Sequence, residues 1–176
     1  MLRRGERREE TPPPGGPHHY QMRERLISIG DDYNIEDEAG RRAFHIDGKA
    51  LRVRHTLKFQ DPSGNDLYEI QERMARVRDT MAITRGGQKV AEVRKALVAP
   101  ARERLDVKIE GGQDMTVQGN LVDHEYEIRQ DGRIPVATVS KRWFRARDTY
   151  GVEVTPGQDA ALILAITVCV DDMLHD

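Results

Sequence analysis

Basic side chains at short, regular spacing form the first group of residues in this sequence that could do chemistry. Residues 50–60 alternate apolar and polar side chains, as a half-buried strand does. The polar side of this segment carries three cations: Arg52, Arg54 and Lys58. Cations two residues apart on a strand point the same way, and a guanidinium group can bind phosphate through paired charge-assisted hydrogen bonds. This side is therefore a first candidate site for an anionic head group.

A second basic cluster surrounds two aromatic residues nearer the C-terminus. Trp143 and Phe144 are flanked by four cations: Lys141, Arg142, Arg145 and Arg147. This composition suits a membrane interface, where aromatic rings enter the head-group region and cations meet anionic lipid. For both clusters the alternative is a solvated outer face whose cations pair with acidic residues. For Trp143 the alternative is packing against the protein.

The remaining polar residues do not form a pattern typical of catalysis or metal binding. His18 and His19 are adjacent in a polar tail, where a metal ion would need further ligands. Asp31 and Asp32 follow a glycine, as turn and capping groups often do, and His55 is interpreted as a hydrogen-bonded interior histidine. Three other histidines have no partner at ligand spacing: His45, His124 and His175. We expect a protein that is not an enzyme and holds no metal or cofactor.

Segments with the two-residue alternation of half-buried strands fill most of the chain. About twelve runs are predicted, at residues 21–29, 33–36, 43–46, 50–60, 67–74, 80–84, 89–94, 105–109, 115–118, 125–129, 136–144 and 150–154. Turn signals such as Gly86-Gly87 and Asp131-Gly132 separate them and supply the positive φ that tight hairpins need. One hairpin after another predicts antiparallel pairing. In addition, residues 83–93 resemble residues 128–139 with one extra loop residue, which predicts two similar hairpins.

The most apolar run, residues 160–170, lies close to the C-terminus. As a helix it would span about 16 Å, roughly half of a ~30 Å hydrocarbon core, so it is too short to cross a membrane. It is apolar on every side, which is typical of a helix enclosed by protein. Thr155 is predicted as its N-cap with Pro156 at the first helical position, and Asp171 and Asp172 are predicted to mark the return to water.

These elements together predict the fold class. It is mainly β, a closed antiparallel barrel of about twelve strands around one central hydrophobic C-terminal helix, because closure removes the sheet edges and buries the helix. Residues 1–18 combine charged residues with a Pro-Gly run and are predicted to be a disordered tail, which leaves residues 19–176 as one barrel domain.

Composition restricts the partners and the compartment. The 28 basic and 30 acidic residues are interspersed and give a net charge of -2, which argues against a nucleic-acid partner. The tail lacks the apolar core of a secretory signal, and no other segment approaches a transmembrane span. The single cysteine, Cys169, lies in the apolar helix and cannot form an internal disulfide. We therefore expect a cytoplasmic protein, peripheral at a membrane if the basic clusters bind lipid.

Several segments occur in the order seen in the LURP-one-related family. They are residues 20–32, Phe44-His-Ile-Asp-Gly-Lys49, Ile128-Arg-Gln-Asp-Gly132, residues 136–144, residues 148–152 and the apolar C-terminal helix. The chain resembles this family over about residues 20–176. The resemblance implies a fold like the C-terminal domain of Tubby proteins and the phospholipid scramblases, a barrel of antiparallel strands around a hydrophobic helix. Tubby-like domains bind phosphoinositide head groups and scramblases act at membranes, whereas the compact members of the LURP-one-related family have no settled activity.

Two classes of function follow from the sequence. The first is a non-enzymatic binding module that holds anionic lipid head groups, or another anionic ligand, on the barrel exterior through the two basic clusters. The second is a structural or protein-interaction scaffold with an unknown protein partner. An unrecognised enzyme is the remote third alternative.

Overall fold

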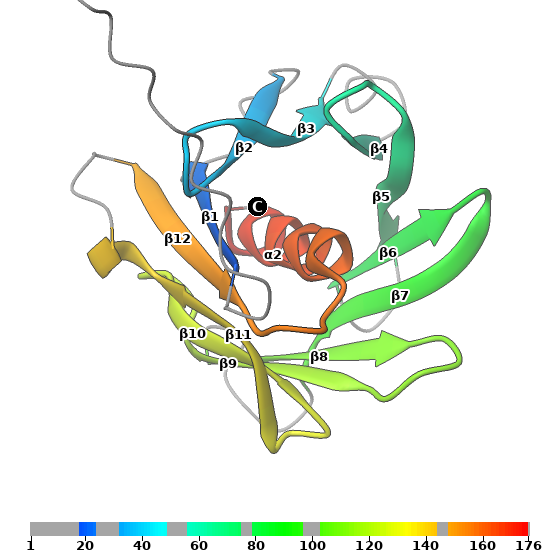
Figure 1. Ribbon diagram of the computed structural model, residues 1–176. Coiled ribbons are helices and arrows are strands. Elements are labelled where there is room, and N and C mark those ends of the chain that lie inside the picture. The colour runs from blue at the N-terminus through cyan, green and yellow to red at the C-terminus, as the bar shows by residue number, and fades with distance from the viewer. Residues whose placement is uncertain are drawn as a thin grey trace, which may run out of the picture.

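Twelve strands and one α-helix make up the core architecture of the computed structural model, which describes residues 18–23, 32–48, 56–74, 79–96, 103–143 and 148–175. The strands form a closed antiparallel barrel around the helix (Figure 1). They are β1 (His18–Arg23), β2 (Tyr33–Asp37), β3 (Arg42–Asp47), β4 (Thr56–Gln60), β5 (Asp66–Met74), β6 (Asp79–Arg85), β7 (Gln88–Lys95), β8 (Arg104–Ile109), β9 (Met115–Asn120), β10 (Glu125–Gln130), β11 (Ile134–Ser140) and β12 (Thr149–Val154), and the helix is α2 (Ala160–His175). Each strand pairs with its neighbours in the sequence, and β1 closes the barrel against β12. The predicted fold class is confirmed.

Most predicted strand boundaries agree with the observed ones, and the differences are local. β1 begins at His18, where it pairs with Val154 of β12, instead of at Gln21. The predicted strand residues 24–29 and 50–55 lie outside the described residues, as do residues 1–17 of the predicted tail. The division into a tail and a barrel domain therefore stays a prediction.

The end of β11 differs from the sequence prediction for a clear physical reason. The predicted strand ran to Phe144, but β11 ends at Ser140 and a 3-10 turn, η1 (Lys141–Trp143), follows. The Glu125 carboxylate accepts the backbone N–H of Lys141 at 3.2 Å, and the Ser140 hydroxyl accepts that of Arg142 at 3.1 Å. The backbone N–H groups of Lys141 and Arg142 are thus bonded to side chains, whereas in a longer β11 they would be available to pair with a neighbouring strand.

The two hairpins predicted to be similar do share their geometry. β6 and β7 shift register between Ile83 and Thr84, and β10 and β11 shift between Ile128 and Arg129, at the equivalent place of the repeated segment. Both turns contain consecutive residues in the left-handed region, with φ of 56° and 80° at residues 86 and 87 and 49° and 66° at residues 131 and 132. The recurrence of the bulge and of the turn supports a common hairpin design.

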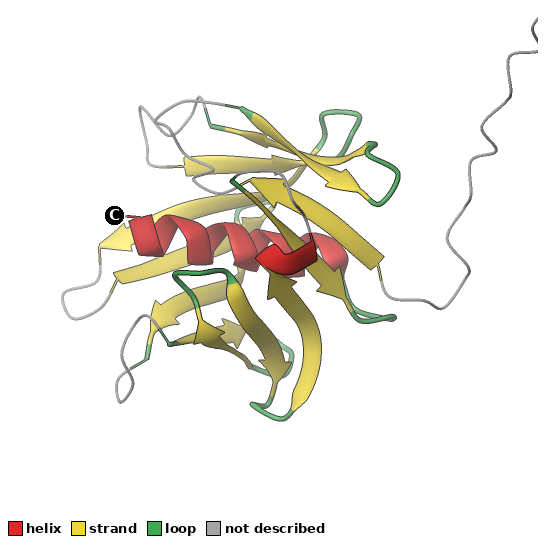
Figure 2. Cartoon of the chain, turned by 90° about the vertical axis from the view of Figure 1, so that its left-hand side faces the viewer, coloured by secondary structure: helices red, strands yellow, loops and turns green. Residues whose placement is uncertain are grey.

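The hydrophobic core is the contact between α2 and the inward faces of the strands. Residues 163–171 of the helix are all buried, and every strand contributes fully enclosed apolar side chains. Figure 2 shows α2 running along the barrel with strands on both sides. Among the helices in the described residues, none has the length and hydropathy required to span a bilayer. The prediction that protein encloses the apolar run is confirmed.

The start of α2 corrects the predicted cap. Asp159 is the N-cap, because its carboxylate accepts the backbone N–H of Leu162 at 3.1 Å. Thr155 instead donates its hydroxyl to the backbone oxygen of Pro135 and accepts the N–H of Gln158 on its own carbonyl. With Pro156 second and residue 157 at φ +83°, residues 155–158 have the pattern of a type II turn. Pro156 therefore belongs to the turn that reverses the chain into the barrel.

Asp159 also fastens this end of the helix to the barrel wall. The hydroxyl of Tyr68 on β5 lies 3.1 Å from the Asp159 carboxylate, and the guanidinium of Arg85 on β6 lies 3.8 Å from it. The same guanidinium donates to the Tyr68 hydroxyl and sits 4.7 Å from the centre of its ring. Burial and the charge of Asp159 raise the pKa of Tyr68 to about 12, so the phenol stays a hydrogen-bond donor.

Candidate functional site

The first basic cluster is represented in the described residues by one cation. Arg52 and Arg54 lie outside the described residues. Lys58 lies on β4, and its ammonium is 2.9 Å from the carboxylate of Asp66 on β5. The hydrogen bond and charge of Asp66 raise the pKa of Lys58. Asp66 also accepts a hydrogen bond from Gln60 at 2.7 Å, so Lys58 is part of a local charge pair on the barrel exterior.

The second basic cluster lies at η1, outside the barrel wall. Arg145 and Arg147 lie outside the described residues, whereas Lys141, Arg142 and Trp143 form the turn itself. The side chain of Arg142 is 85% exposed, and its closest carboxylate, Glu125, is 3.8 Å away. Trp143 is 42% exposed, and the other exposed large apolar side chains of the described residues are Val122 and Ile134. We call Lys141, Arg142 and Trp143 the η1 patch.

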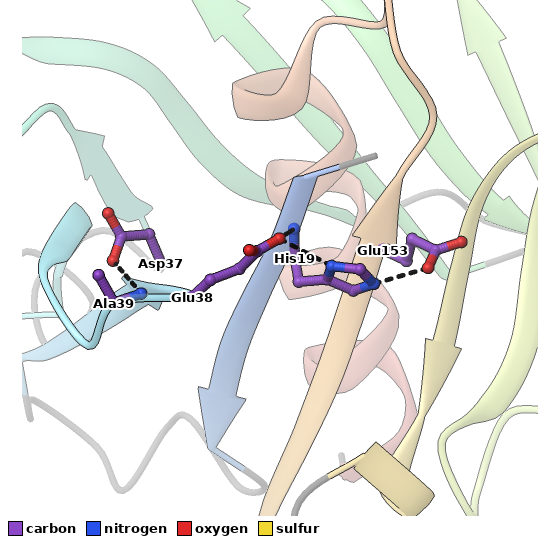
Figure 3. A network of polar contacts seen from close by, with 5 residues as sticks. All are labelled: His19, Asp37, Glu38, Ala39 and Glu153. Atoms are coloured by element: carbon purple, nitrogen blue, oxygen red, sulfur yellow. Dashed lines mark hydrogen bonds and ion pairs between the residues drawn. The ribbon is translucent and has the colours of Figure 1, made fainter. Parts of the chain in front are cut away.

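His19 holds a polar network beside the η1 patch (Figure 3). Its Nδ1 lies 2.8 Å from Glu38, in the turn between β2 and β3, and its Nε2 lies 2.6 Å from Glu153 on β12. The ring meets Trp143 edge to face, with centroids 5.8 Å apart. The sequence interpretation that His19 belongs to a polar tail is wrong, because β1 places it directly opposite Glu153. Its network therefore ties β1 to both neighbouring strands.

The charge of the His19 network depends on pH. Burial lowers the pKa of His19, but the hydrogen bonds and charges of Glu38 and Glu153 outweigh it and leave the pKa raised above 6.5. The hydrogen bond from His19 lowers the pKa of Glu38 from its ordinary value of 4.5. With both ring nitrogens next to carboxylates, the imidazolium form is favoured. The two carboxylates occupy opposite nitrogens of the ring, so they do not converge on a shared metal position.

We expect the stabilisation from His19 to be largest between about pH 5 and 6, judged by comparing the wild type with His19→Gln. A raised histidine pKa gives stability that is complete below 6.5 and is lost as pH rises through the folded value. The lowered pKa of Glu38 gives stability above 4.5 that is lost on acidification. The difference should stay below about 1 kcal/mol because the side chains are 37% to 47% exposed. Urea unfolding across this pH range measures it.

The control for this experiment is His18→Gln, on the same strand but without the two carboxylate contacts. It should show a smaller pH dependence than His19→Gln. A stability difference for His19→Gln that does not vary with pH would contradict the assignment of the charged ring.

A second polar cluster is buried at the C-terminal end of α2. Asp171 is 2% exposed; it accepts the hydroxyl hydrogen of Tyr150 at 2.5 Å, and Nε2 of His124 lies 2.9 Å from its other oxygen. The rings of His124 and Tyr150 stack at 4.3 Å. Burial, with the charge of Asp171 added, raises the pKa of Tyr150 well above its usual value. The predicted return to water at Asp171 is therefore wrong, and His124 has a partner that sequence spacing did not reveal.

The enclosure of this cluster indicates its role. His124 and Asp171 are 1% and 2% exposed and Tyr150 is fully buried, so they are too enclosed to meet a substrate. Burial likewise raises the pKa of the neighbouring Cys169 thiol well above its usual value, which leaves it unreactive. Among the described residues, no three His, Cys, Asp or Glu side chains are arranged to hold a metal ion. The cluster fastens α2 to β12 and to the turn before β10.

A groove of about 490 Å³ lies on the outer face of the barrel, over β7, β8 and β9. It is lined by Arg94, Arg104, Asp106, Val107, Lys108, Asp114, Met115, Thr116, Asp131 and Gly132. Sequence analysis did not identify these residues as a site, since they come from three strands and two turns. Their three cations and three carboxylates make the groove polar and electrically mixed.

A comparison with protein-family models identifies the family of this chain. The model of the LURP-one-related family matches residues 18–171. The chain belongs to the LURP-one-related family. Its relative YxjI of Bacillus subtilis, an uncharacterized protein, is 24% identical over 155 residues, which cover 88% of this chain and 93% of the Bacillus protein.

A solved structure extends this agreement to the fold. An X-ray structure of an Arabidopsis thaliana protein superposes with a TM-score of 0.70 at 19% identity, covering 92% of this chain and 93% of that one. The likeness shows that this LURP-one-related chain shares the fold of the plant protein.

Proposed function

We propose that this LURP-one-related barrel is a non-enzymatic binding module that attaches to anionic lipid head groups through the η1 patch. The observation that carries the proposal is that Arg142, whose side chain is 85% exposed, and Trp143, a residue that is 42% exposed, lie in one short turn. An aromatic ring with a polar edge is favoured at the membrane interface, and neighbouring cations are attracted by anionic lipid.

The expected strength of the interaction follows from the number of cations. Each cation close to an anionic surface contributes about 1 kcal/mol, so Lys141 and Arg142 alone would give weak association. Arg145 and Arg147 follow within the next four residues of the sequence and would double the charge. The attraction acts over a Debye length of about 10 Å at 0.1 M salt, so binding should weaken steeply as ionic strength rises.

The contacts of the two basic clusters support the η1 patch as the first choice. Lys58 is held at 2.9 Å by Asp66, whereas Arg142 extends into solvent with its nearest carboxylate at 3.8 Å. A cation that is already paired must give up that contact to bind a ligand. The contribution of Arg52 and Arg54 stays a prediction.

We expect the wild type to co-sediment with vesicles that contain anionic lipid and not with neutral vesicles. The triple variant Lys141→Glu, Arg142→Glu, Trp143→Ala should lose most of this binding, because it reverses two charges and removes the ring. The matched control is Arg73→Glu with Arg133→Glu, two exposed cations on other parts of the barrel. Circular dichroism checks that each variant is folded.

Three outcomes of the vesicle experiment are informative. Indifference of the wild type to lipid charge at low salt would reject lipid binding. Binding that survives in the η1 variant but is lost in Arg52→Glu, Arg54→Glu, Lys58→Glu would move the site to the first cluster. Equal loss in the control variant would mean that only the net charge matters.

The scaffold alternative is supported by the charge balance of the barrel wall. Several cations on the outer face of the barrel are paired with carboxylates, as in the contacts of Lys58 with Asp66, Lys89 with Glu92, and Arg129 with Glu127. A surface compensated in this way has little long-range attraction for an anionic membrane. If the wild type does not distinguish anionic from neutral vesicles, a protein-interaction scaffold becomes the better description of this protein.

A further inference from the structure

The groove over β7, β8 and β9 has a frame fixed by strand register and by one turn. Arg94 of β7 pairs with Asp106 of β8, which pairs with Thr116 of β9, so the three form one row across the outer face. The β10–β11 turn closes one side, because the backbone N–H of Asp131 donates to the carbonyl of Asp114 at 2.9 Å. A Cβ at residue 132 would lie 3.9 Å from the Thr116 hydroxyl. The β10–β11 turn is thus held close to Thr116 of β9.

The two ends of the groove have opposite charge. At one end the lining has two cations, Arg94 and Arg104, and one carboxylate, Asp106. The Asp106 carboxylate lies 3.2 Å from the Arg104 guanidinium, and the Arg94 guanidinium lies 3.8 Å from Glu92. At the other end Asp114 and Asp131 stand with Lys108, so two negative charges face one positive charge. The lining residues are balanced as a whole, with three cations and three carboxylates.

The separation of the two ends restricts the size of a ligand. Arg104 and Lys108 are four residues apart on β8, about 13 Å between Cα atoms at the usual rise of a strand. The long arginine side chains can shorten the distance that a ligand must bridge. A volume of about 490 Å³ is within the range of small-molecule sites, which is about 300 to 1,000 Å³.

We infer that this groove binds a small zwitterionic ligand, a short peptide with free termini, with its carboxylate at Arg94 and Arg104 and its ammonium at Asp114 and Asp131. Guanidinium groups bind carboxylates through paired charge-assisted hydrogen bonds, and carboxylates accept the three donors of an ammonium group. A ligand with only one charge would satisfy one end and leave the other unpaired. The inference is independent of the η1 patch, which lies on η1 beyond β11.

The experiment titrates the full chain with trialanine and follows the amide signals of Thr116 and Gly132 by nuclear magnetic resonance. Trialanine should shift these signals and saturate at millimolar concentration. Trialanine amide and acetyl-trialanine each lack one charge and should bind at least about tenfold more weakly, the factor expected for about 1.4 kcal/mol. Phosphoethanolamine tests whether the same chemistry in a lipid head group competes for the groove.

Matched variants decide whether the two charged ends carry the binding. Arg104→Gln and Asp131→Asn should each weaken trialanine binding about tenfold. Asparagine tolerates the positive φ of residue 131, so the turn is preserved. The control Arg133→Gln changes a cation of the same turn that does not line the groove and should bind like the wild type.

Loss in the two variants with retention in the control supports the inference, and tighter binding of phosphoethanolamine than of trialanine would identify the head group as the source of the zwitterion. The inference is overturned if the single-charge peptides bind as well as trialanine, or if no ligand shifts the Thr116 and Gly132 signals. No vesicle is used, so failure here is distinguishable from failure of lipid binding at η1.

Discussion

Leu164→Asp is expected to lower the free energy of unfolding by several kcal/mol. Leu164 is fully buried in the first half of α2, and the strands of the barrel present apolar side chains to the helix. An isolated carboxylate at this position would have to be buried without a partner or stay neutral, at a cost of several kcal/mol. Because the total stability of a domain of this size is about 5 to 15 kcal/mol, one such change removes much of it. Urea unfolding followed by circular dichroism measures the loss.

The matched control makes the same kind of substitution on the outside. Ile134→Asp replaces an apolar residue that is 59% exposed at the start of β11. It should change the free energy of unfolding by no more than about 0.5 kcal/mol, as most surface substitutions do. If Leu164→Asp unfolded at the same urea concentration as Ile134→Asp, α2 would not be the core of the barrel.

The barrel and its central helix could be predicted from the sequence because both depend on local periodicity. A half-buried strand alternates with a period of two residues, and this pattern is visible in strands such as β4, β8 and β10. β6, with four consecutive buried residues, departs from it. The apolar stretch of α2 is similarly visible in the sequence, since burial on all sides needs apolar residues on all sides. Closure follows from the many hairpins, which bring each strand beside the next.

The start of α2 could not be decided locally, because two signals overlap between residues 155 and 159. Thr155, Pro156 and the glutamine at 158 fit a helix start, while Pro156 and a following glycine equally fit a turn. The structure favours the turn because Thr155 bonds to β11 and Asp159 bonds to Tyr68, 91 positions away in the chain. Contacts between residues so far apart in the sequence cannot be predicted from the spacing of neighbouring residues.

The groove and the His19 network were missed for a related reason. Arg94, Asp106 and Thr116 become neighbours only through the register of three strands, and register depends on exact pairing. His19 meets Glu153 because β1 closes against β12 across the whole chain. One signal was present for the buried cluster: acidic residues at a helix C-terminus are unfavourable unless something compensates them.

The compensation at Asp171 explains why an aspartate is tolerated at that end of α2. Its buried carboxylate accepts a hydrogen bond from the hydroxyl of Tyr150, and its other oxygen contacts Nε2 of His124. At the opposite end Asp159 makes the corresponding contacts with Tyr68 and Arg85. An aspartate at each end thus fixes the axial position of the helix, which apolar packing alone specifies poorly because it is not directional.

Asp171→Ala is accordingly expected to lower the free energy of unfolding by about 2 to 5 kcal/mol, because each of two buried polar groups would lose its contact with the carboxylate at a cost of about 1 to 3 kcal/mol. Tyr150 and His124 would keep their buried polar atoms but lose the carboxylate that both contact. Tyr150→Phe removes only one hydroxyl and should cost about 1 to 2 kcal/mol. Urea unfolding of the two single variants and of the double variant gives the coupling energy.

The exposed carboxylate Glu72 on β5 provides the control, because Glu72→Ala removes an acid of the same charge from the surface and should change stability by about 0.5 kcal/mol or less. A loss of stability in Asp171→Ala as small as that in Glu72→Ala would mean that the cluster does not hold the helix, and additive effects of Asp171→Ala and Tyr150→Phe would mean that the two side chains are not coupled.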